Sequence, residues 1–343
     1  MIKIEPVRAF HLRFSSHDLV EPFKEFIEKV LVPKGINHLV LECNTAFVFE
    51  SHPEISGKGK LTKEDAKELS ETCKNNGIRL IPLFQCLGHQ GWGGAPNTIL
   101  KAYPEFDETP HVPLDAKWPD FFCRSWCPLH PDVNALAFDL MDELIDAFEA
   151  DAFHVGMDEV YAMADDECPR CKGKDRADLF AKSVNDMYGH LVKKRGVEMF
   201  MWGDRLNDSD KTGYNPWEGD TFGTHRAIDS IPNDIVIMDW HYDKLDAYPS
   251  IGIFIEKGFT VIPACWFKTG AAVDLLDESK RQAEELRSEG KMPGMIVTSW
   301  NGWTKESFGK FVNMAPPSKE SQEELEELEE LYRTLDVITG KLA

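Results

Sequence analysis

Eight short runs of branched and aromatic residues recur along this chain, and longer amphipathic stretches separate them. These runs predict strands over residues 8–14, 38–44, 79–86, 152–157, 199–203, 236–242, 260–267 and 295–300. Capping signals or apolar helical spacing mark residues 62–76, 134–149 and 177–194 between them. Eight strands that alternate with helices favour an α/β fold, the closed (β/α)8 TIM barrel, whose catalytic groups come from the carboxyl ends of the strands.

No Gly-, Ser- or Pro-rich linker divides the 343 residues, so we expect a single domain. Residues 1–317 would form the catalytic barrel, and residues 318–343 an acidic C-terminal helix packed on it. The net charge of −21 disfavours a nucleic-acid partner or an anionic membrane surface. Because the N-terminus lacks a secretory signal and no segment is apolar enough to span a bilayer, we expect a cytoplasmic protein.

Two adjacent acids, Asp158 and Glu159, stand where the predicted strand at 152–157 would pass into a loop. Neighbouring side chains on an extended chain point to opposite sides, so one carboxylate can face a pocket floor while the other reaches along its rim. The alternative for an isolated pair is a helix N-terminus, where acids interact favourably with the helix dipole.

Tryptophans stand at or near the ends of four successive predicted strands: Trp202, Trp240, Trp266 and Trp300. Their flat apolar rings match the C–H face of a pyranose, and the indole N–H is left to form a hydrogen bond. The alternative is that these rings plug the top of the barrel. The set therefore favours a carbohydrate site.

The chain resembles glycoside hydrolase family 20, the β-N-acetylhexosaminidases. That family's strand-four motif is His-x-Gly-Gly-Asp-Glu, and here it reads His154-Val155-Gly156-Met157-Asp158-Glu159, with methionine at the second glycine. The likeness, which spans about residues 8–303, includes Gly88-His89 after strand three, the early Arg8 and the strand-end tryptophans. Since the first strand begins almost at once, we expect that the small domain often preceding this family's barrel is absent.

The resemblance implies a retaining exo-glycosidase that removes terminal β-linked N-acetylhexosamine, GlcNAc or GalNAc, from small amino-sugar glycosides or oligosaccharides. Glu159 would be the acid/base. Asp158 would orient the substrate's 2-acetamido group, whose oxygen attacks the anomeric carbon and gives an oxazolinium intermediate. No cofactor is required for this catalysis.

The same resemblance assigns further residues. Arg8 would grip sugar hydroxyls, with a structural ion pair as the alternative. His89 and His154 would support the acid/base region, although a histidine in an apolar strand is often a core residue. The remaining expected substrate contacts are the walls and hydroxyl ligands Trp202, Trp240, Trp266, Trp300, Asp204 and Asn301.

One family position is changed, because the tyrosine that bonds the acetamido group in family 20 aligns with Phe267. Tyr242 is the candidate to supply that hydroxyl from a neighbouring position, and the alternative is that nothing replaces it and substrate assistance is weakened. The family's strand-eight Trp-x-Glu aligns with Trp300-Asn301, which leaves the choice between gluco and galacto sugars open.

Two close thiol pairs, Cys123 with Cys127 and Cys168 with Cys171, fall in the predicted loops after strands three and four. They predict a structural zinc site with four cysteine ligands that joins the two loops, with free thiols or a disulfide as the alternatives.

Two other functions compete with the glycosidase. A metal-dependent barrel hydrolase would use His154, Asp158, and His225 or His241 as ligands. A non-catalytic carbohydrate-binding barrel would keep the aromatic pocket without chemistry.

Overall fold

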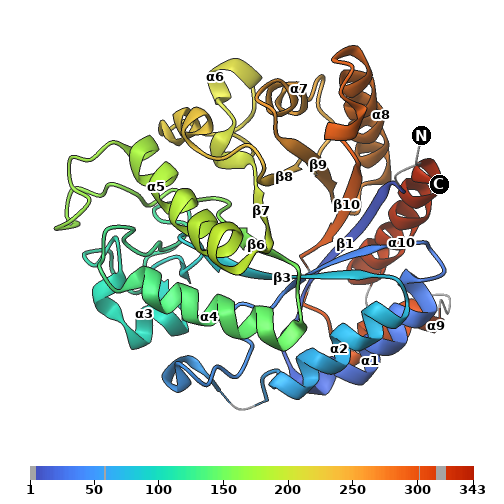
Figure 1. Cartoon of the computed structure of the whole chain (residues 1–343), viewed down its shortest axis with the longest axis horizontal. Helices are drawn as coiled ribbons and strands as arrows, with labels where there is room; N and C mark the ends of the chain where they lie inside the picture. The colour runs from blue at the N-terminus through green and yellow to red at the C-terminus, as the bar shows by residue number, and fades with distance from the viewer. Residues whose placement is uncertain (1–4, 58, 301, 314–321) are drawn as a thin grey trace.

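Eight parallel strands close into a barrel in the computed structural model, which describes residues 5–57, 59–300, 302–313 and 322–343 (Figure 1). Around the ring the strands are β1 (Val7–Arg13), β2 (His38–Glu42), β3 (Arg79–Cys86), β6 (Ala152–Gly156), β7 (Glu198–Trp202), β8 (Val236–Trp240), β9 (Thr260–Cys265) and β10 (Gly294–Ser299). The TIM-barrel prediction and all eight predicted strands are confirmed. Three predicted strands continue two residues past the observed ends of β2, β8 and β9, because the chain leaves the hydrogen-bonded ladder at the rim.

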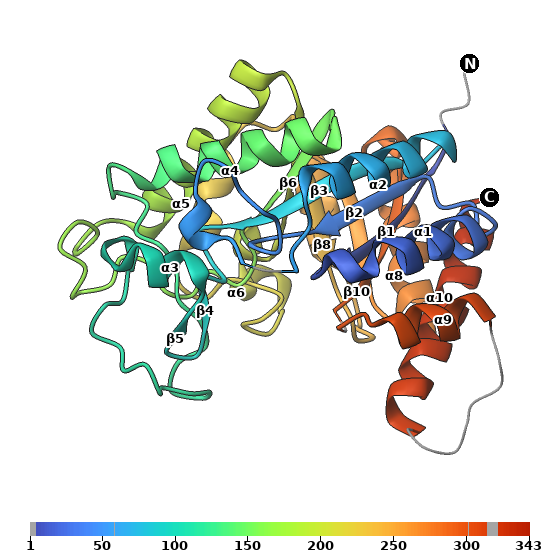
Figure 2. The ribbon, with the colours of Figure 1, turned by 90° about the horizontal axis from the view of Figure 1, so that it is seen from below.

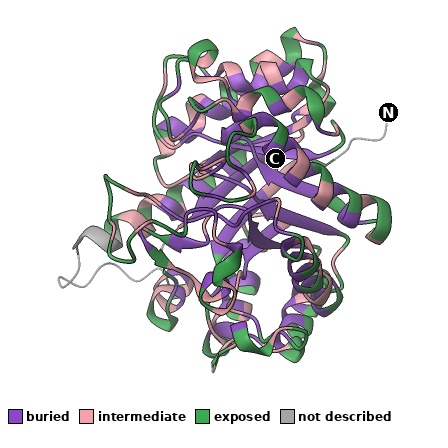
Figure 3. Ribbon diagram, turned by 90° about the vertical axis from the view of Figure 1, so that its left-hand side faces the viewer, coloured by how far each residue is buried: buried purple, intermediate pink, exposed green. Residues whose placement is uncertain are grey.

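The strands are buried on both faces, as parallel strands covered by helices must be. On β8, Val236 and Met238 belong to the apolar cluster inside the barrel, whereas Ile237 between them belongs to the cluster under the helices. Figure 3 shows the strands as buried and the outer faces of the helices as exposed.

The seam of the barrel joins β1 to β10 in register from Val7 opposite Gly294 to Leu12 opposite Ser299. A side chain at Gly294 would put its Cβ 1.9 Å from the Val7 carbonyl oxygen. The two strands can therefore approach only because this position is glycine.

Helices connect the strands on the outside: α1 (Val20–Phe26), α2 (Lys63–Asn75), α4 (Val133–Phe148), α5 (Arg176–Tyr188), α7 (Pro249–Glu256), α8 (Thr269–Glu285) and α9 (Lys305–Asn313). The predicted helices at 62–76, 134–149 and 177–194 correspond to α2, α4 and α5, the last continued by a π-helical segment, Gly189–Arg195. Thr62 and Asp65 form the capping box at the start of α2. None of the described helices has both the length and the apolar character needed to cross a bilayer.

The long segment between β3 and α4 has little regular structure. It contains only short elements: β4 (Gly91–Trp92), β5 (Ala95–Pro96), α3 (Thr98–Ala102) and a 3-10 turn, Pro104–Phe106. Figure 2 shows this segment extending to the side opposite the last helices of the chain.

The last described helix, α10 (Gln322–Leu342), packs against α8, α9 and the β1–β10 seam. Its buried apolar side chains are Leu331, Leu335, Ile338 and Leu342. The expected start of this helix and its boundary at residues 317/318 lie outside the described residues.

We predict that Leu335→Ala lowers the free energy of unfolding by about 2–5 kcal/mol, because Leu335 is fully buried and its removal leaves a cavity. Glu329→Ala, on an exposed position of the same helix, should change it by less than about 0.5 kcal/mol. Urea unfolding followed by far-UV circular dichroism and tryptophan fluorescence measures both. Equal stability of the two variants, or a separate early transition for the helix alone, would show that α10 is not part of the barrel's cooperative unit.

Candidate active site

A cavity of about 430 Å³ opens at the carboxyl ends of the strands. Its lining residues come from the ends of β1, β2, β3, β6, β8 and β10 and from the β3–α4 and β7–β8 segments: Arg13, Glu42, Asn44, Gln85, His89, Trp92, Asp158, Glu159, Asn215, Trp217, Glu218, Trp240, Tyr242, Asp243 and Trp300. This is the end of the barrel that carries catalytic groups in TIM-barrel enzymes. The cavity volume falls within the range of small-molecule sites.

The acid pair is presented by a sharp turn directly after β6. Gly156, Met157 and Glu159 all have left-handed backbone conformations, with φ values of 68°, 68° and 51°. A side chain at Gly156 would put its Cβ 1.9 Å from Oε1 of Gln85 and 3.1 Å from the Gln85 Cα, so a larger residue would displace the Gln85 side chain from its place in the cavity lining. Each left-handed non-glycine residue costs about 1–2 kcal/mol, and such strain is typical of functional turns. The turn brings both carboxylates into the cavity lining.

The helix-N-terminus alternative for the acid pair is wrong, because no helix begins at Asp158. The next helix, α5, begins at Arg176. The acids are therefore free to act in the cavity.

His89 faces both acids. Its Nε2 lies 3.2 Å from Oδ2 of Asp158 and 3.3 Å from Oε2 of Glu159. Neither contact is aligned as a hydrogen bond, so charge attraction dominates. Burial works against a charge on His89, but Asp158 and Glu159 outweigh it and hold its pKa well above the usual value.

Burial would raise the pKa of Asp158, whereas the His89 charge lowers it, and the net shift is downward. Asp158 is therefore a carboxylate at neutral pH, as its expected role requires.

Asp204 lies behind Glu159 and outside the cavity lining, which corrects its prediction as a hydroxyl ligand. Its Oδ2 accepts hydrogen bonds from the Glu159 backbone N–H at 2.8 Å and from Nε of Arg205 at 2.7 Å. Burial raises the pKa of Asp204, and the Arg205 guanidinium opposes that shift. Asp204 therefore fixes the backbone of the acid pair from the neighbouring strand end.

Two of the four predicted tryptophans form cavity walls. Trp240 and Trp300 line the cavity, and Nε1 of Trp300 donates a hydrogen bond of 2.8 Å to the Tyr242 hydroxyl oxygen. Trp240 stacks on the Tyr242 ring with centroids 5.1 Å apart. Burial raises the pKa of Tyr242 well above its usual value, so the hydroxyl keeps its proton.

Trp202 and Trp266 lie outside the lining, so their prediction as walls is corrected. Trp202 is fully buried inside the barrel because it points inward from the last position of β7, and its ring centroid lies 5.8 Å from that of Trp300 and 4.7 Å from that of His154. Trp266 packs edge-on against Tyr242 with centroids 5.7 Å apart. Both rings therefore pack against residues that line the cavity without lining it themselves.

Arg8 is not a sugar ligand, and that prediction is wrong. It stands near the amino end of β1, pairs with Glu5 and donates to the Gly35 carbonyl, which is the structural ion pair of the alternative. Arg13, at the carboxyl end of the same strand and about 16 Å further along it, lines the cavity instead. Arg8 lies at the amino end of β1, whereas the catalytic site of a barrel is built from the carboxyl ends of its strands.

His154 is a core residue that shapes the turn and does not reach the cavity. Its Nδ1 accepts a hydrogen bond of 3.0 Å from the Gly156 backbone N–H, and burial lowers its pKa to about 3. Phe267 also lies away from the lining, packed on Trp266, whereas Tyr242 is part of the lining. The predicted ligand Asn301 lies outside the described residues.

Several lining residues were not predicted from the sequence. Arg13, Glu42, Asn44 and Gln85 all stand within two residues of the carboxyl end of a predicted strand, so the same carboxyl-end rule could have found them. Trp217 and Glu218 come from the irregular β7–β8 segment, where no sequence spacing marks them.

Glu218 is held in the wall by a buried network. Its Oε2 lies 2.8 Å from Nδ1 of His241, whose Nε2 lies 3.0 Å from Oδ2 of Asp239. Burial alone would lower the pKa of His241, but Asp239 and Glu218 raise it to about 9. A charged histidine thus anchors Glu218 at neutral pH.

The histidines of the metal-hydrolase hypothesis do not converge. His225 pairs with Asp220, His241 belongs to the Glu218 network, and His154 is in the core. Among the described residues, the histidine close enough to Asp158 and Glu159 to bind one metal ion together with them is His89. That hypothesis therefore loses the ligand set on which it depended.

The predicted set of four cysteine ligands is partly wrong. Cys127, Cys168 and Cys171 meet, and the fourth member of the group is Glu108. The Cys123 Sγ instead lies 3.9 Å from the Glu159 carbonyl oxygen. All eight cysteines are buried and unpaired, so the disulfide alternative is not observed.

An aromatic hollow adjoins the cavity mouth. Trp92 and Trp217 line both, and the outer hollow continues over Leu114 and Trp118, which are 70% and 63% exposed. The Trp118 and Trp217 rings lie 5.0 Å apart. Exposed aromatic surface beside a polar cavity is typical of a binding surface.

The pattern described as "Glycosyl hydrolase family 20, catalytic domain" matches residues 39–315 of this sequence. The chain belongs to glycosyl hydrolase family 20. A beta-hexosaminidase of Akkermansia muciniphila is 29% identical over 119 residues, which cover 34% of this chain and 23% of that protein. A beta-hexosaminidase of Emericella nidulans is 25% identical over 227 residues, 62% of this chain and 34% of that protein.

The solved structure of Flavobacterium johnsoniae chitobiase is similar to this family 20 chain with a TM-score of 0.67. The match has 15% identity and covers 98% of this chain and 52% of that one, so it shows the shared fold alone. This chain spans less than half the length of the curated relatives it matches.

We predict that Asp204→Asn and Asp204→Ala separate the two contacts of this carboxylate in the family 20 site. Asparagine keeps an oxygen for the Glu159 N–H but removes the charge that faces buried Arg205, so stability should fall by about 3–5 kcal/mol. Alanine also removes the Glu159 contact. Hydrogen exchange of the Glu159 amide should therefore accelerate in Asp204→Ala relative to Asp204→Asn.

Urea unfolding measures the stability of each variant, and amide exchange followed by NMR under native conditions measures the opening at Glu159. Equal exchange at Glu159 in the two variants would contradict the bracing role.

Proposed function

We propose that this protein is a retaining exo-glycosidase that removes terminal β-linked N-acetylhexosamine by substrate-assisted catalysis. The observation that carries the proposal is the buried Oδ1 of Asp158, which has no hydrogen-bond partner and belongs to a side chain in the cavity lining beside Glu159. A buried carboxylate oxygen without a partner is costly unless a ligand completes it. The N–H of a 2-acetamido group is a donor of the required kind.

The first step breaks the glycosidic bond. Glu159 gives its proton to the leaving oxygen, while the carbonyl oxygen of the substrate's own acetamido group attacks the anomeric carbon from the opposite face. The product is a cyclic oxazolinium ion and a free alcohol. Asp158, kept anionic by His89, accepts the acetamido N–H and stabilises the positive charge that develops on that group.

The second step restores the enzyme. Glu159, now a carboxylate, takes a proton from water as the water oxygen attacks the anomeric carbon and the C–O bond to the acetamido oxygen breaks. Two inversions at one carbon give overall retention. Asp204 holds the Glu159 backbone in place during both proton transfers.

Tyr242 supports the attacking group. Its oxygen accepts the Trp300 N–H, so its own proton is available for the acetamido oxygen. The Trp240 and Trp300 rings supply apolar faces for the sugar and the methyl group. Arg13 and Glu42, 3.8 Å apart at the ends of β1 and β2, offer charged partners for ring hydroxyls.

We expect hydrolysis of 4-nitrophenyl β-N-acetylglucosaminide, β-N-acetylgalactosaminide or both, with kcat lowered about 10²–10⁴-fold in Asp158→Asn and in Glu159→Gln. Glu289→Gln, an exposed position at the other end of the barrel, is the matched control and should retain the wild-type rate. Release of 4-nitrophenol measures the rates.

Substrates whose acetamido group carries one, two or three fluorines test the assistance itself. Fluorine withdraws electrons from the attacking oxygen, so kcat should fall with each added fluorine. Rates that do not respond to fluorination would contradict an acetamido nucleophile. Binding of N-acetylglucosamine without any turnover, by a folded protein, would favour the non-catalytic carbohydrate-binding barrel.

We also propose that the outer aromatic hollow receives the sugar on the leaving-group side. Trp118→Ala should lower kcat/KM for the β-linked di- and trisaccharides of N-acetylglucosamine by about two- to tenfold. It should leave kcat/KM for the methyl glycoside unchanged, because a methyl group does not reach the hollow.

Phe222→Ala, an exposed aromatic residue outside the hollow, is the control. Equal losses for the methyl glycoside and the oligosaccharides, or losses of the same size in Phe222→Ala, would contradict a leaving-group subsite at Trp118.

A further inference from the structure

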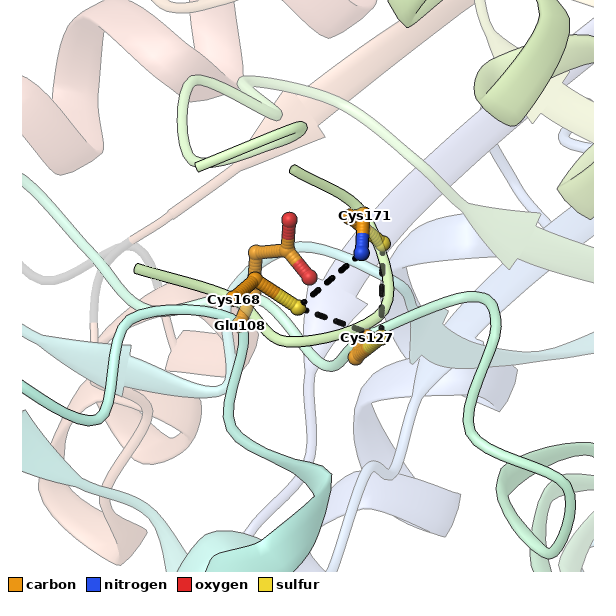
Figure 4. A group of neighbouring side chains, drawn as sticks. All are labelled: Glu108, Cys127, Cys168 and Cys171. Carbon is orange, nitrogen blue, oxygen red and sulfur yellow. Dashed lines mark hydrogen bonds between the residues drawn. The ribbon is translucent and has the colours of Figure 1, made fainter. Parts of the chain in front are cut away.

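Three thiols and one carboxylate from two separate loops meet in a buried cluster (Figure 4). Glu108 and Cys127 belong to the segment between β3 and α4, and Cys168 and Cys171 to the segment between β6 and α5. One ligand atom of each residue lies within 4.8 Å of the others. We propose that these four residues form a structural zinc site.

The sulfur spacing fits a metal and not a disulfide. The Cys127 Sγ lies 3.3 Å from the Cys171 Sγ and 3.6 Å from the Cys168 Sγ. A disulfide requires about 2.05 Å. Four ligands at Zn–S distances of about 2.3 Å place the sulfurs about 3.8 Å apart at the corners of a tetrahedron. The two sulfur–sulfur distances lie within about 0.5 Å of that tetrahedral value.

The ligand chemistry favours zinc over calcium and magnesium. Thiolates are soft ligands that bind zinc, whereas calcium and magnesium prefer oxygen atoms alone. All four residues are fully buried, and a closed four-coordinate site without an open position is typical of structural zinc.

The fourth position is an unsatisfied carboxylate oxygen. Oε1 of Glu108 accepts the Asp165 N–H at 3.1 Å, but Oε2 is buried without a partner. A cation between this oxygen and the three sulfurs supplies the missing interaction.

The backbone around the sulfurs favours thiolates. The Cys171 N–H points to the Cys168 Sγ at 3.4 Å, a bond within the Cys168-Pro169-Arg170-Cys171 turn. The backbone N–H of Asp165, in the segment between β6 and α5, donates a hydrogen bond to Oε1 of Glu108 and so holds that carboxylate beside the sulfurs.

The position of the cluster gives the metal a structural task. The β3–α4 segment carries His89 and Trp92, and the β6–α5 segment carries Asp158 and Glu159. Long segments with little regular structure are expensive to order, and a metal clip that joins two of them reduces that cost. Zinc at this cluster therefore fixes the loop of His89 against the loop of the acid pair.

The test measures metal and not activity, so its outcome is independent of the proposed function. Full-length protein is purified under reducing conditions without chelators, incubated with zinc sulfate and dialysed, and its metal content is measured by mass spectrometry. We expect about one zinc per chain. Cobalt(II) in place of zinc should give thiolate-to-cobalt charge-transfer bands and intense visible bands of tetrahedral cobalt. Removal of zinc by a strong chelator should lower Tm.

Matched variants identify the ligands. Cys168→Ser with Cys171→Ser should lose the metal, while Cys73→Ser, a buried thiol on α2, should keep it. Glu108→Gln should weaken zinc binding about tenfold or more, whereas Cys123→Ser should bind zinc as the wild type does. Because Glu108→Gln keeps the side-chain shape, it remains informative if the double serine variant does not fold.

Three results would overturn the proposal. The first is a folded wild-type protein that holds neither zinc nor cobalt after incubation. The second is zinc retained by Glu108→Gln with unchanged affinity but lost by Cys123→Ser. The third is a chain two hydrogen atoms lighter than its fully reduced mass, with a peptide map that joins two of Cys127, Cys168 and Cys171 by a disulfide.

Discussion

Pairing between β1 and β10 closes the sheet, and the position of every other group in the site follows from that closure. In an open sheet the carboxyl ends of eight strands lie along a line, whereas in a ring they face one axis. Arg13 from the first strand and Trp300 from the last can line one cavity only because the seam at Gly294 brings β1 and β10 together. The cavity is therefore a property of the closed barrel and not of any one loop.

Within that ring, the acid pair is held from both sides. His89, from the β3 side, supplies positive charge that keeps Asp158 anionic, while Asp204, from the β7 side, fixes the backbone of Glu159. One contact sets a protonation state and the other sets a position. The proposed glycosidase needs both, because an anionic Asp158 must orient the acetamido group while Glu159 transfers a proton at a fixed place.

The sequence was sufficient to predict the barrel and the acid pair, because apolar runs and a motif at a strand end are local signals. The sequence was not sufficient to assign the two arginines of β1. Arg8 stands near the amino end of the strand and forms a structural ion pair, whereas Arg13 stands at the carboxyl end and lines the cavity. Trp202 differs from Trp300 because its side chain points into the barrel core. Glu108 and Glu218 come from long irregular segments, where three-dimensional folding alone determines which residues meet.

The left-handed turn from Gly156 to Glu159 also limits how portable this chemistry is. Two of its four residues, Met157 and Glu159, adopt left-handed backbone conformations that non-glycine residues of a free peptide would rarely populate. Gln85 on β3 fits against Gly156, and Asp204 after β7 holds Glu159, so the turn keeps its shape through its neighbours. An engineer who grafts this turn onto another barrel must transplant the ends of three adjacent strands together.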